Sequence, residues 1–175
     1  TFEATKTLAT EEVEVETPLT LTKGVRLASP APLIIPILRA GLGMLSGITK
    51  LLPDADVGFL GIKRNERTLQ PETYANRLPN DLTGRHVILI DPMLATGGTI
   101  NDSLDYAFER GAETATCICL LGAPEGVEAV TTHLNRSWPK QGVTIHLAAL
   151  DEKLNEIGYI LPGLGDAGDR LFGIN

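Results

Sequence analysis

The sequence predicts an α/β fold in which a parallel sheet is covered by helices on both faces. Short apolar runs recur along the chain, and segments with helical periodicity separate most of them. Strands that alternate with helices in this way form parallel sheets that are buried on both sides. A chain of 175 residues, of which 43% are hydrophobic, suits a single domain with a sizeable core, and we expect one domain over 1–175.

The expected elements follow one another in a regular order. Residues 10–22 alternate apolar and polar side chains around Thr17-Pro18, which predicts an N-terminal β-hairpin. Residues 64–80 are polar and rich in turn-forming residues, and we expect a flap hairpin there. The glycine-rich residues 155–175 show no clear periodicity. The other strands are expected at 33–38, 57–62, 86–90, 115–121 and 143–149, and the helices at 41–52, 98–110 and 124–134.

The composition argues against several classes of protein. The formal net charge is −7, which disfavours electrostatic binding of nucleic acid. No stretch approaches the roughly 20 apolar residues of a membrane span, and no secretory signal is visible. We therefore expect a cytoplasmic protein without nucleic-acid or membrane partners. Cysteine, histidine and tryptophan residues of the chain are expected to serve packing or to lie at the surface, and not to take part in chemistry. They are Cys117, Cys119, His86, His133, Trp138 and His146.

The clearest functional motif occupies residues 87–99. A buried strand leads to Asp91, a loop of small residues follows, and then a helix begins. Ligands bind at the carboxyl ends of parallel strands, and free N–H groups at a helix N-terminus suit a phosphate. Gly97-Gly98 lets the backbone wrap around an anion, Thr96 and Thr99 add hydroxyl donors, and the carboxylate of Asp91 suits the hydroxyls of a ribose. The alternative is a tight strand-to-helix turn with a capping aspartate.

Arg39 stands at a comparable place, directly after the expected strand 33–38. A guanidinium there can bind pyrophosphate oxygens with two parallel hydrogen bonds, and the backbone after it can present N–H groups in an unusual peptide geometry. A structural ion pair is the alternative interpretation of this arginine.

Three long motifs, in this order, resemble the uracil phosphoribosyltransferase family of type I phosphoribosyltransferases. They are Pro36–Met44, Asp91–Thr99 and Tyr159–Asp169. The resemblance covers residues 1–175 and implies a Rossmann-like phosphoribosyltransferase fold that here lacks the family's N-terminal arm. It also implies a homodimer or a higher homo-oligomer.

The resemblance implies a set of site residues for phosphoribosyl pyrophosphate (PRPP) and uracil. Catalytic roles are expected for Asp91, Arg39 and Asp166. PRPP contacts are expected from Arg39, Arg64, Asp91, Pro92, Met93, Leu94, Ala95, Thr96, Gly97, Gly98, Thr99 and Asp166. Uracil contacts are expected from Ile160, Gly165, Asp166 and Ala167, because a glycine-rich backbone can approach the edge of a flat base. The expected cofactor is Mg²⁺, held mainly through PRPP and water near Asp166 with no direct protein ligand.

The implied reaction transfers the phosphoribosyl group of PRPP to N1 of uracil and yields UMP and pyrophosphate. Many phosphoribosyltransferases carry two adjacent acids at the ribose site, whereas Pro92 follows Asp91 here, as in the uracil branch. Two alternatives remain open: a phosphoribosyltransferase for another base, and a PRPP-fold regulator that binds RNA and senses nucleotides.

Overall fold

A computed structural model describes residues 1–64 and 71–173. Its main sheet has the strand order β10-β9-β7-β3-β5-β6, and every neighbouring pair in this order is parallel except the antiparallel pair β5 and β6. The strands of this order are β3 (Leu33–Leu38), β5 (Phe59–Arg64), β6 (Pro71–Arg77), β7 (His86–Ile90), β9 (Thr114–Gly122) and β10 (Gly142–Leu150).

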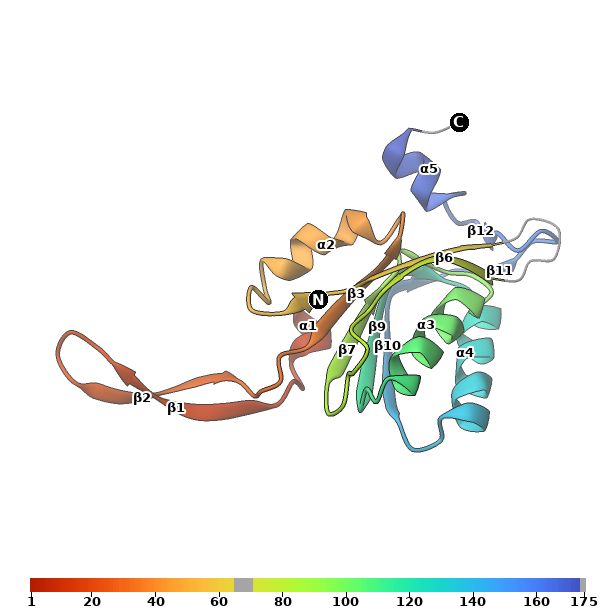
Figure 1. Cartoon of the computed structure of the whole chain (residues 1–175). Coiled ribbons are helices and arrows are strands. Elements are labelled where there is room, and N and C mark those ends of the chain that lie inside the picture. Colours follow the sequence, from red (N-terminus) through yellow and green to blue (C-terminus); the bar gives the residue numbers. More distant parts are fainter. Residues whose placement is uncertain (65–70, 174–175) are drawn as a thin grey trace.

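Helices cover both faces of this sheet, as the sequence predicts (Figure 1). On one face α3 (Gly98–Glu109) and α4 (Pro124–Ser137) pack over side chains such as Ile35 and Leu89. On the other face α2 (Leu42–Thr49) and the short α1 (Phe2–Thr5) pack over side chains such as Ile34 and Ile88. Neighbouring residues of β3 and β7 therefore enter opposite cores, which is why these strands are apolar throughout.

The predicted N-terminal hairpin is present and projects from the body of the molecule (Figure 1). Its strands β1 (Thr10–Glu16) and β2 (Leu21–Leu27) are antiparallel, and Glu11 and Arg26 form an ion pair of 2.7 Å across them. In the turn, Thr17 Oγ1 accepts the main-chain N–H groups of Leu19 and Thr20.

Several boundaries differ from the sequence prediction. The helix expected over 41–52 spans only Leu42–Thr49, and in the turn that follows the N–H groups of Leu51 and Leu52 both donate to the carbonyl of Ile48. The strand expected over 57–62 is interrupted at Gly58, which separates β4 (Asp56–Val57) from β5. The N–H of Gly58 donates to the carbonyl of Ile34. The expected flap contains β6 as its returning strand, and its tip lies outside the described residues.

The C-terminal region is more regular than its composition suggests. The antiparallel pair β11 (Lys153–Leu154) and β12 (Ile160–Leu161) is followed by α5 (Ala167–Phe172), and β8 (Met93–Leu94) adds a short parallel pair with β9. Asp166 caps α5, because its side chain accepts the N–H of Asp169. Over 1–64 and 71–173, no helix is long and apolar enough to cross a membrane.

Candidate active site

The loop from Asp91 to Gly97 joins β7 to α3 at the carboxyl end of the sheet. Its start is fixed by the carbonyl of Pro92, which accepts the N–H groups of Leu120 and Leu121 at 3.0 Å each. Its end is fixed by Gly97, which precedes α3 with a φ of 81°, a left-handed conformation that favours glycine. The loop thus delivers the free N–H groups of the α3 N-terminus to one place, which suits a phosphate.

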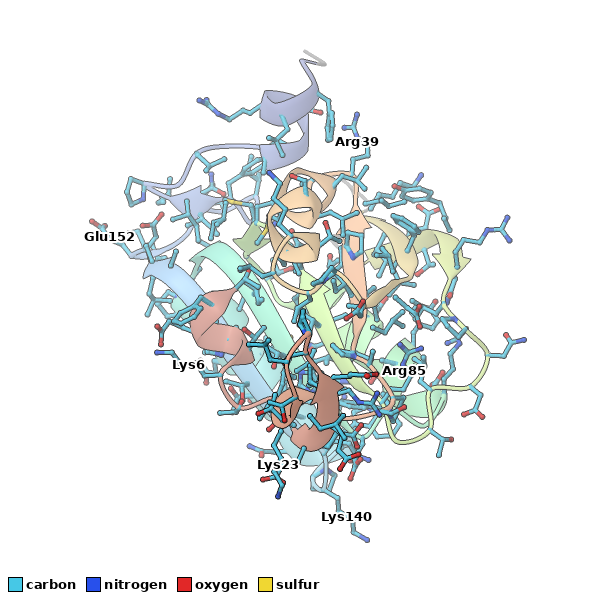
Figure 2. All side chains as sticks on the ribbon, turned by 90° about the vertical axis from the view of Figure 1, so that its left-hand side faces the viewer. Lys6, Lys23, Arg39, Arg85, Lys140 and Glu152 are labelled. Atoms are coloured by element: carbon cyan, nitrogen blue, oxygen red, sulfur yellow. The ribbon has the colours of Figure 1, made fainter. Side chains whose placement is uncertain are left out.

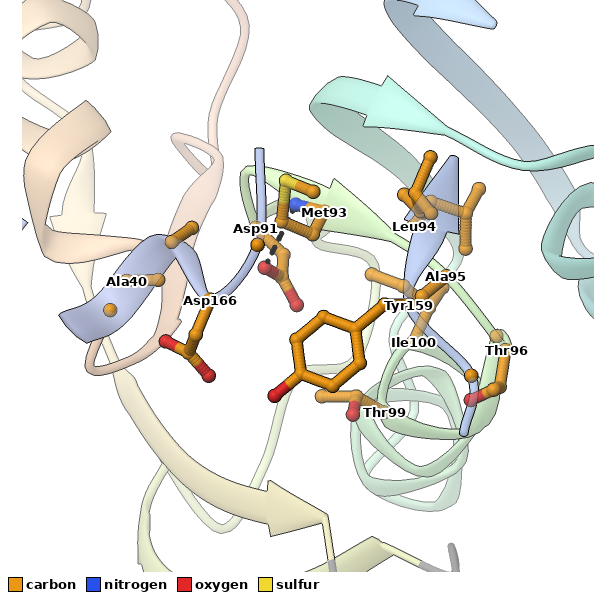
Figure 3. Close-up of a pocket in the computed structure, with 16 residues that line it drawn as sticks. Ala40, Asp91, Met93, Leu94, Ala95, Thr96, Thr99, Ile100, Tyr159 and Asp166 are labelled. Atoms are coloured by element: carbon orange, nitrogen blue, oxygen red, sulfur yellow. Dashed lines mark hydrogen bonds between the residues drawn. The ribbon is translucent and has the colours of Figure 1, made fainter. Parts of the chain in front are cut away.

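Three segments far apart in the sequence surround one cavity of about 200 Å³ (Figure 3). The lining residues come from the end of β3, from the loop before α3 and from the segment around β12. They are Ala40, Asp91, Met93, Leu94, Ala95, Thr96, Gly97, Thr99, Ile100, Gly158, Tyr159, Ile160, Gly165, Asp166, Ala167 and Gly168. The structure thus brings together most of the residues that the sequence predicts for PRPP and all four that it predicts for uracil.

Asp91 is the most perturbed acid of this cavity. Burial raises the pKa of its carboxyl group to about 7, the N–H donated by Met93 over 3.3 Å opposes the rise, and the charge of Asp166 adds to it. Part of the Asp91 population therefore carries a proton at neutral pH. Asp166 brings a second carboxylate to the cavity from a remote segment, although the residue next to Asp91 is a proline.

Arg39 lines an adjoining cavity that shares Asp91, Thr99 and Asp166 with the first. The peptide bond between Leu38 and Arg39, which precedes this arginine, is cis. Arg39 Nη2 donates to Asp169 Oδ1 at 2.9 Å, and both side chains are nearly half exposed. Figure 2 shows Arg39 at the same end of the molecule as α5. Arg39 thus borders the cavity and also forms an ion pair.

The segment around β12 is anchored by the two residues that follow β10. Gly163 donates its N–H to the Asp151 carboxylate at 3.0 Å, and Glu152 donates to the carbonyl of Leu161 at 3.0 Å. These bonds fix the approach of the main chain between Ile160 and Ala167. This rigid backbone can present N–H and C=O groups to a flat polar ring.

Besides Arg39, three predicted residues are not among those that line the first cavity. Pro92 is buried and turns its carbonyl toward β9, and Gly98 is taken into α3. The side chain of Arg64 lies outside the described residues. Conversely, sequence reasoning missed Tyr159, whose ring lies within the cavity between Asp166 and Thr99 (Figure 3). An aromatic residue directly before Ile160 was the available signal.

Three of the residues predicted to serve packing lie on the central strands β7 and β9. Cys117 and Cys119 are buried free thiols, and burial raises the pKa of both, that of Cys117 to about 12. His86 contacts the hydroxyls of Thr114 and Thr116 at 2.7 and 3.0 Å.

The fold first defines a general class. The hypoxanthine phosphoribosyltransferase from Trypanosoma cruzi, solved in complex with the product IMP, superimposes with a TM-score of 0.52 and 16% identity over 71% of this chain and 63% of that chain. The AQ2163 protein from Aquifex aeolicus is much more similar, with a TM-score of 0.87 and 39% identity over 99% of this chain and 80% of that chain. The fold is therefore that of the phosphoribosyltransferases.

Sequence comparison narrows the class to one family. The family model described as uracil phosphoribosyltransferase matches residues 1–174. The uracil phosphoribosyltransferase of Renibacterium salmoninarum is 59% identical over 99% of this chain and 80% of its own length. The chain belongs to the uracil phosphoribosyltransferase family.

Proposed function

We propose that the protein transfers the phosphoribosyl group of PRPP to N1 of uracil and releases pyrophosphate and UMP. One observation supports this most directly: the phosphate loop and the backbone around β12 face each other across one cavity, and Arg39 borders the adjoining one. A nucleotide product needs that arrangement, with phosphate, ribose and base bound side by side. The relative from Renibacterium salmoninarum, which is named for this reaction, is 59% identical.

The first half of the site suits PRPP. The N–H groups and hydroxyls of residues 95–99 would bind the 5′-phosphate, and the Asp91 carboxylate would accept hydrogen bonds from the ribose hydroxyls. Arg39, with Arg64 from the end of β5, would bind the pyrophosphate group. Pro92 and Gly98 would support the loop through their backbone and contact PRPP less directly than the sequence predicts.

The second half of the site suits uracil. The ring presents alternating donors and acceptors along one edge, and main-chain groups of Ile160 and Ala167 would pair with them. Gly165 leaves room for that approach, and Asp166 of this segment lines the same cavity as Asp91. The base specificity is thus proposed to rest on backbone hydrogen bonds.

The donor set fits Mg²⁺ as an ion that arrives with PRPP. Asp91 and Asp166 supply carboxylate oxygens, but within 1–64 and 71–173 no group of three or more His, Cys, Asp or Glu residues could hold a metal. Mg²⁺ characteristically keeps several waters and binds through one or two carboxylates and substrate phosphates. When bound, it would neutralise charge on the leaving pyrophosphate.

The chemistry needs no covalent intermediate on the protein. The bond from C1 of the ribose to the pyrophosphate oxygen breaks, N1 of uracil bonds to C1, and the N1 proton passes to solvent. Residues of the cavity position the two substrates, and Arg39 stabilises negative charge on the departing group. The flap over residues 64–80 would exclude water, which competes with uracil for C1.

An assay of pyrophosphate release with PRPP and Mg²⁺ tests the proposal. Uracil should support release together with UMP formation, whereas orotate, hypoxanthine and adenine should not. Asp91→Asn and Arg39→Ala should each lose most of the activity and remain folded, while Glu11→Gln in the remote hairpin should retain it. Near wild-type UMP formation in either site variant, or a preference for another base, would contradict the proposal.

The proposed partners include a second copy of the chain. The projecting hairpin exposes the apolar side chains of Leu19, Leu21 and Val25, the first of them to 95%, and a homodimer would bury them. Sedimentation should show a dimer or larger species, and Leu19→Glu with Val25→Glu should shift it toward monomer. A wild-type monomer at micromolar concentration would refute this. A cytoplasmic location remains a prediction, which cell fractionation would test.

A further inference from the structure

Asp169 connects the two halves of the candidate active site. Its carboxylate accepts the hydrogen bond of 2.9 Å from Arg39 Nη2, on the pyrophosphate side. Its main-chain N–H donates over 2.9 Å to Asp166 Oδ1, on the base side. Asp169, in the first turn of α5, therefore contacts both Arg39 and Asp166, and these two residues line the adjoining cavity.

The geometry leaves Arg39 able to bind an anion while it is held. A guanidinium has five N–H donors, and Asp169 uses one of them at Nη2. Nη2 carries one N–H on the edge that it shares with Nε and one on the edge that it shares with Nη1. The edge that Asp169 does not use remains for the two parallel hydrogen bonds that a pyrophosphate oxygen pair accepts. A carboxylate on one edge also fixes the plane of the guanidinium, which otherwise turns about a long flexible stem.

The same ion pair contributes little to the stability of the fold. The side chains of Arg39 and Asp169 are 46% and 45% exposed, and pairs at such sites stabilise proteins weakly. A role in function therefore explains the arrangement better than a role in folding.

We propose that Asp169 is a positioning residue that holds the Arg39 guanidinium for PRPP and ties it to the uracil-binding segment through Asp166. This inference rests on the proposed function. It assigns to Asp169 a contact with Arg39 and none with the reacting atoms. Replacing Asp169 should therefore weaken PRPP binding when Arg39 is present. It should have little effect once Arg39 itself has been replaced.

The test compares Asp169→Asn and Asp169→Glu with the wild type and with Glu11→Gln, which removes an equally exposed ion-pair carboxylate in the hairpin. Steady-state kinetics should show the KM for PRPP of Asp169→Asn raised roughly three- to tenfold, with kcat changed less than the KM. Asp169→Glu keeps the charge and should recover part of the affinity. Glu11→Gln should behave as wild type, and the melting temperatures of the variants should agree within a few degrees.

A double-mutant cycle with Arg39→Lys separates positioning from a general effect of α5. Calorimetric titration with Mg²⁺ and PRPP, in the absence of uracil, measures binding for Asp169→Asn, Arg39→Lys and the double variant. The effect of Asp169→Asn should largely disappear in the Arg39→Lys background. If Asp169→Asn does not fold, the cycle is run with Asp169→Glu instead.

Three results would overturn the inference. They are an unchanged affinity for PRPP in Asp169→Asn, a tighter affinity, which would show that Asp169 competes with pyrophosphate, and an equal loss in both Arg39 backgrounds. Failure of the proposed function would look different, because the wild type itself would then make no UMP from PRPP and uracil.

Discussion

Asp91 and Asp166 face the same cavity from opposite segments, and the charge of Asp166 contributes to a pKa of about 7 for Asp91, which burial mainly causes. The carboxyl group proposed to hold the ribose thus titrates near neutral pH. Its ionised form offers both oxygens as acceptors and binds the two ribose hydroxyls more strongly than the protonated form, in which one oxygen carries a proton.

We predict that kcat/KM for PRPP rises with pH through an acid limb near pH 7. The limb reports the free enzyme, in which Asp91 must lose its proton before PRPP is held. In Asp166→Asn the overall rate should fall, and the limb should move to lower pH because a neighbouring negative charge is gone. A pH profile of initial rates at low PRPP checks this, and a limb unmoved in Asp166→Asn would count against the coupling of the two acids.

Stability should depend on the same group with a defined sign. Asp91 has a raised pKa in the folded state and an ordinary one in the unfolded state, so its ionisation destabilises the fold as pH rises from about 4 to about 7. Asp91→Asn, which keeps an oxygen for the Met93 N–H, should match wild type near pH 4. Above pH 7 it should gain about 1 to 4 kcal/mol in unfolding free energy.

Urea denaturation at a series of pH values measures this difference. Asp54→Asn, at an exposed position, serves as the control and should show no comparable trend. A constant difference between Asp91→Asn and wild type from pH 4 to pH 8 would show that Asp91 ionises normally in the folded protein.

Gly126, in the first turn of α4, supports the phosphate loop from outside the cavity. A Cβ built on it would overlap the carbonyl of Ala95, and its own carbonyl lies against Gly97. Gly126→Ala should therefore displace the loop and lower kcat/KM for PRPP by about tenfold or more.

The matched control is Gly47→Ala in α2, where an added Cβ meets nothing within 4 Å. It should leave the kinetics unchanged and raise the unfolding free energy by about 0.5 to 1 kcal/mol, the gain in helix propensity. Equal kinetics for both alanine variants would show that a Cβ at position 126 does not displace the loop enough to affect activity.

The sequence predicted the central sheet well because buried parallel strands are continuous apolar runs, as in Leu33–Leu38 and His86–Ile90. It did not predict β11, β12 or α5, because strands of two residues and a helix of six residues carry no usable periodicity. The contact of Arg39 with Asp169 spans 130 residues and depends on the final packing of α5. Local patterns therefore indicated the phosphate loop, whereas the partner of Arg39 could be identified only from the folded structure.

The residues predicted to serve packing near the end of α4 offer a final test. Asp105 Oδ1 accepts hydrogen bonds from Trp138 Nε1 at 2.6 Å and from His133 Nε2 at 2.7 Å, and Trp138 packs against the ring of Phe108. Asp105→Ala would leave two partly buried donors without this acceptor, which costs roughly 1 to 3 kcal/mol.

We expect thermal and urea denaturation of Asp105→Ala to show that loss, while kcat and both KM values stay at wild-type levels. Asp105→Asn keeps one acceptor oxygen and should lose less stability. Because the cluster ties α3 to α4 away from the cavity, a changed KM for PRPP in a folded Asp105→Ala protein would mean that α3 transmits strain to its own N-terminus. That result would make the packing of these helices part of the active site.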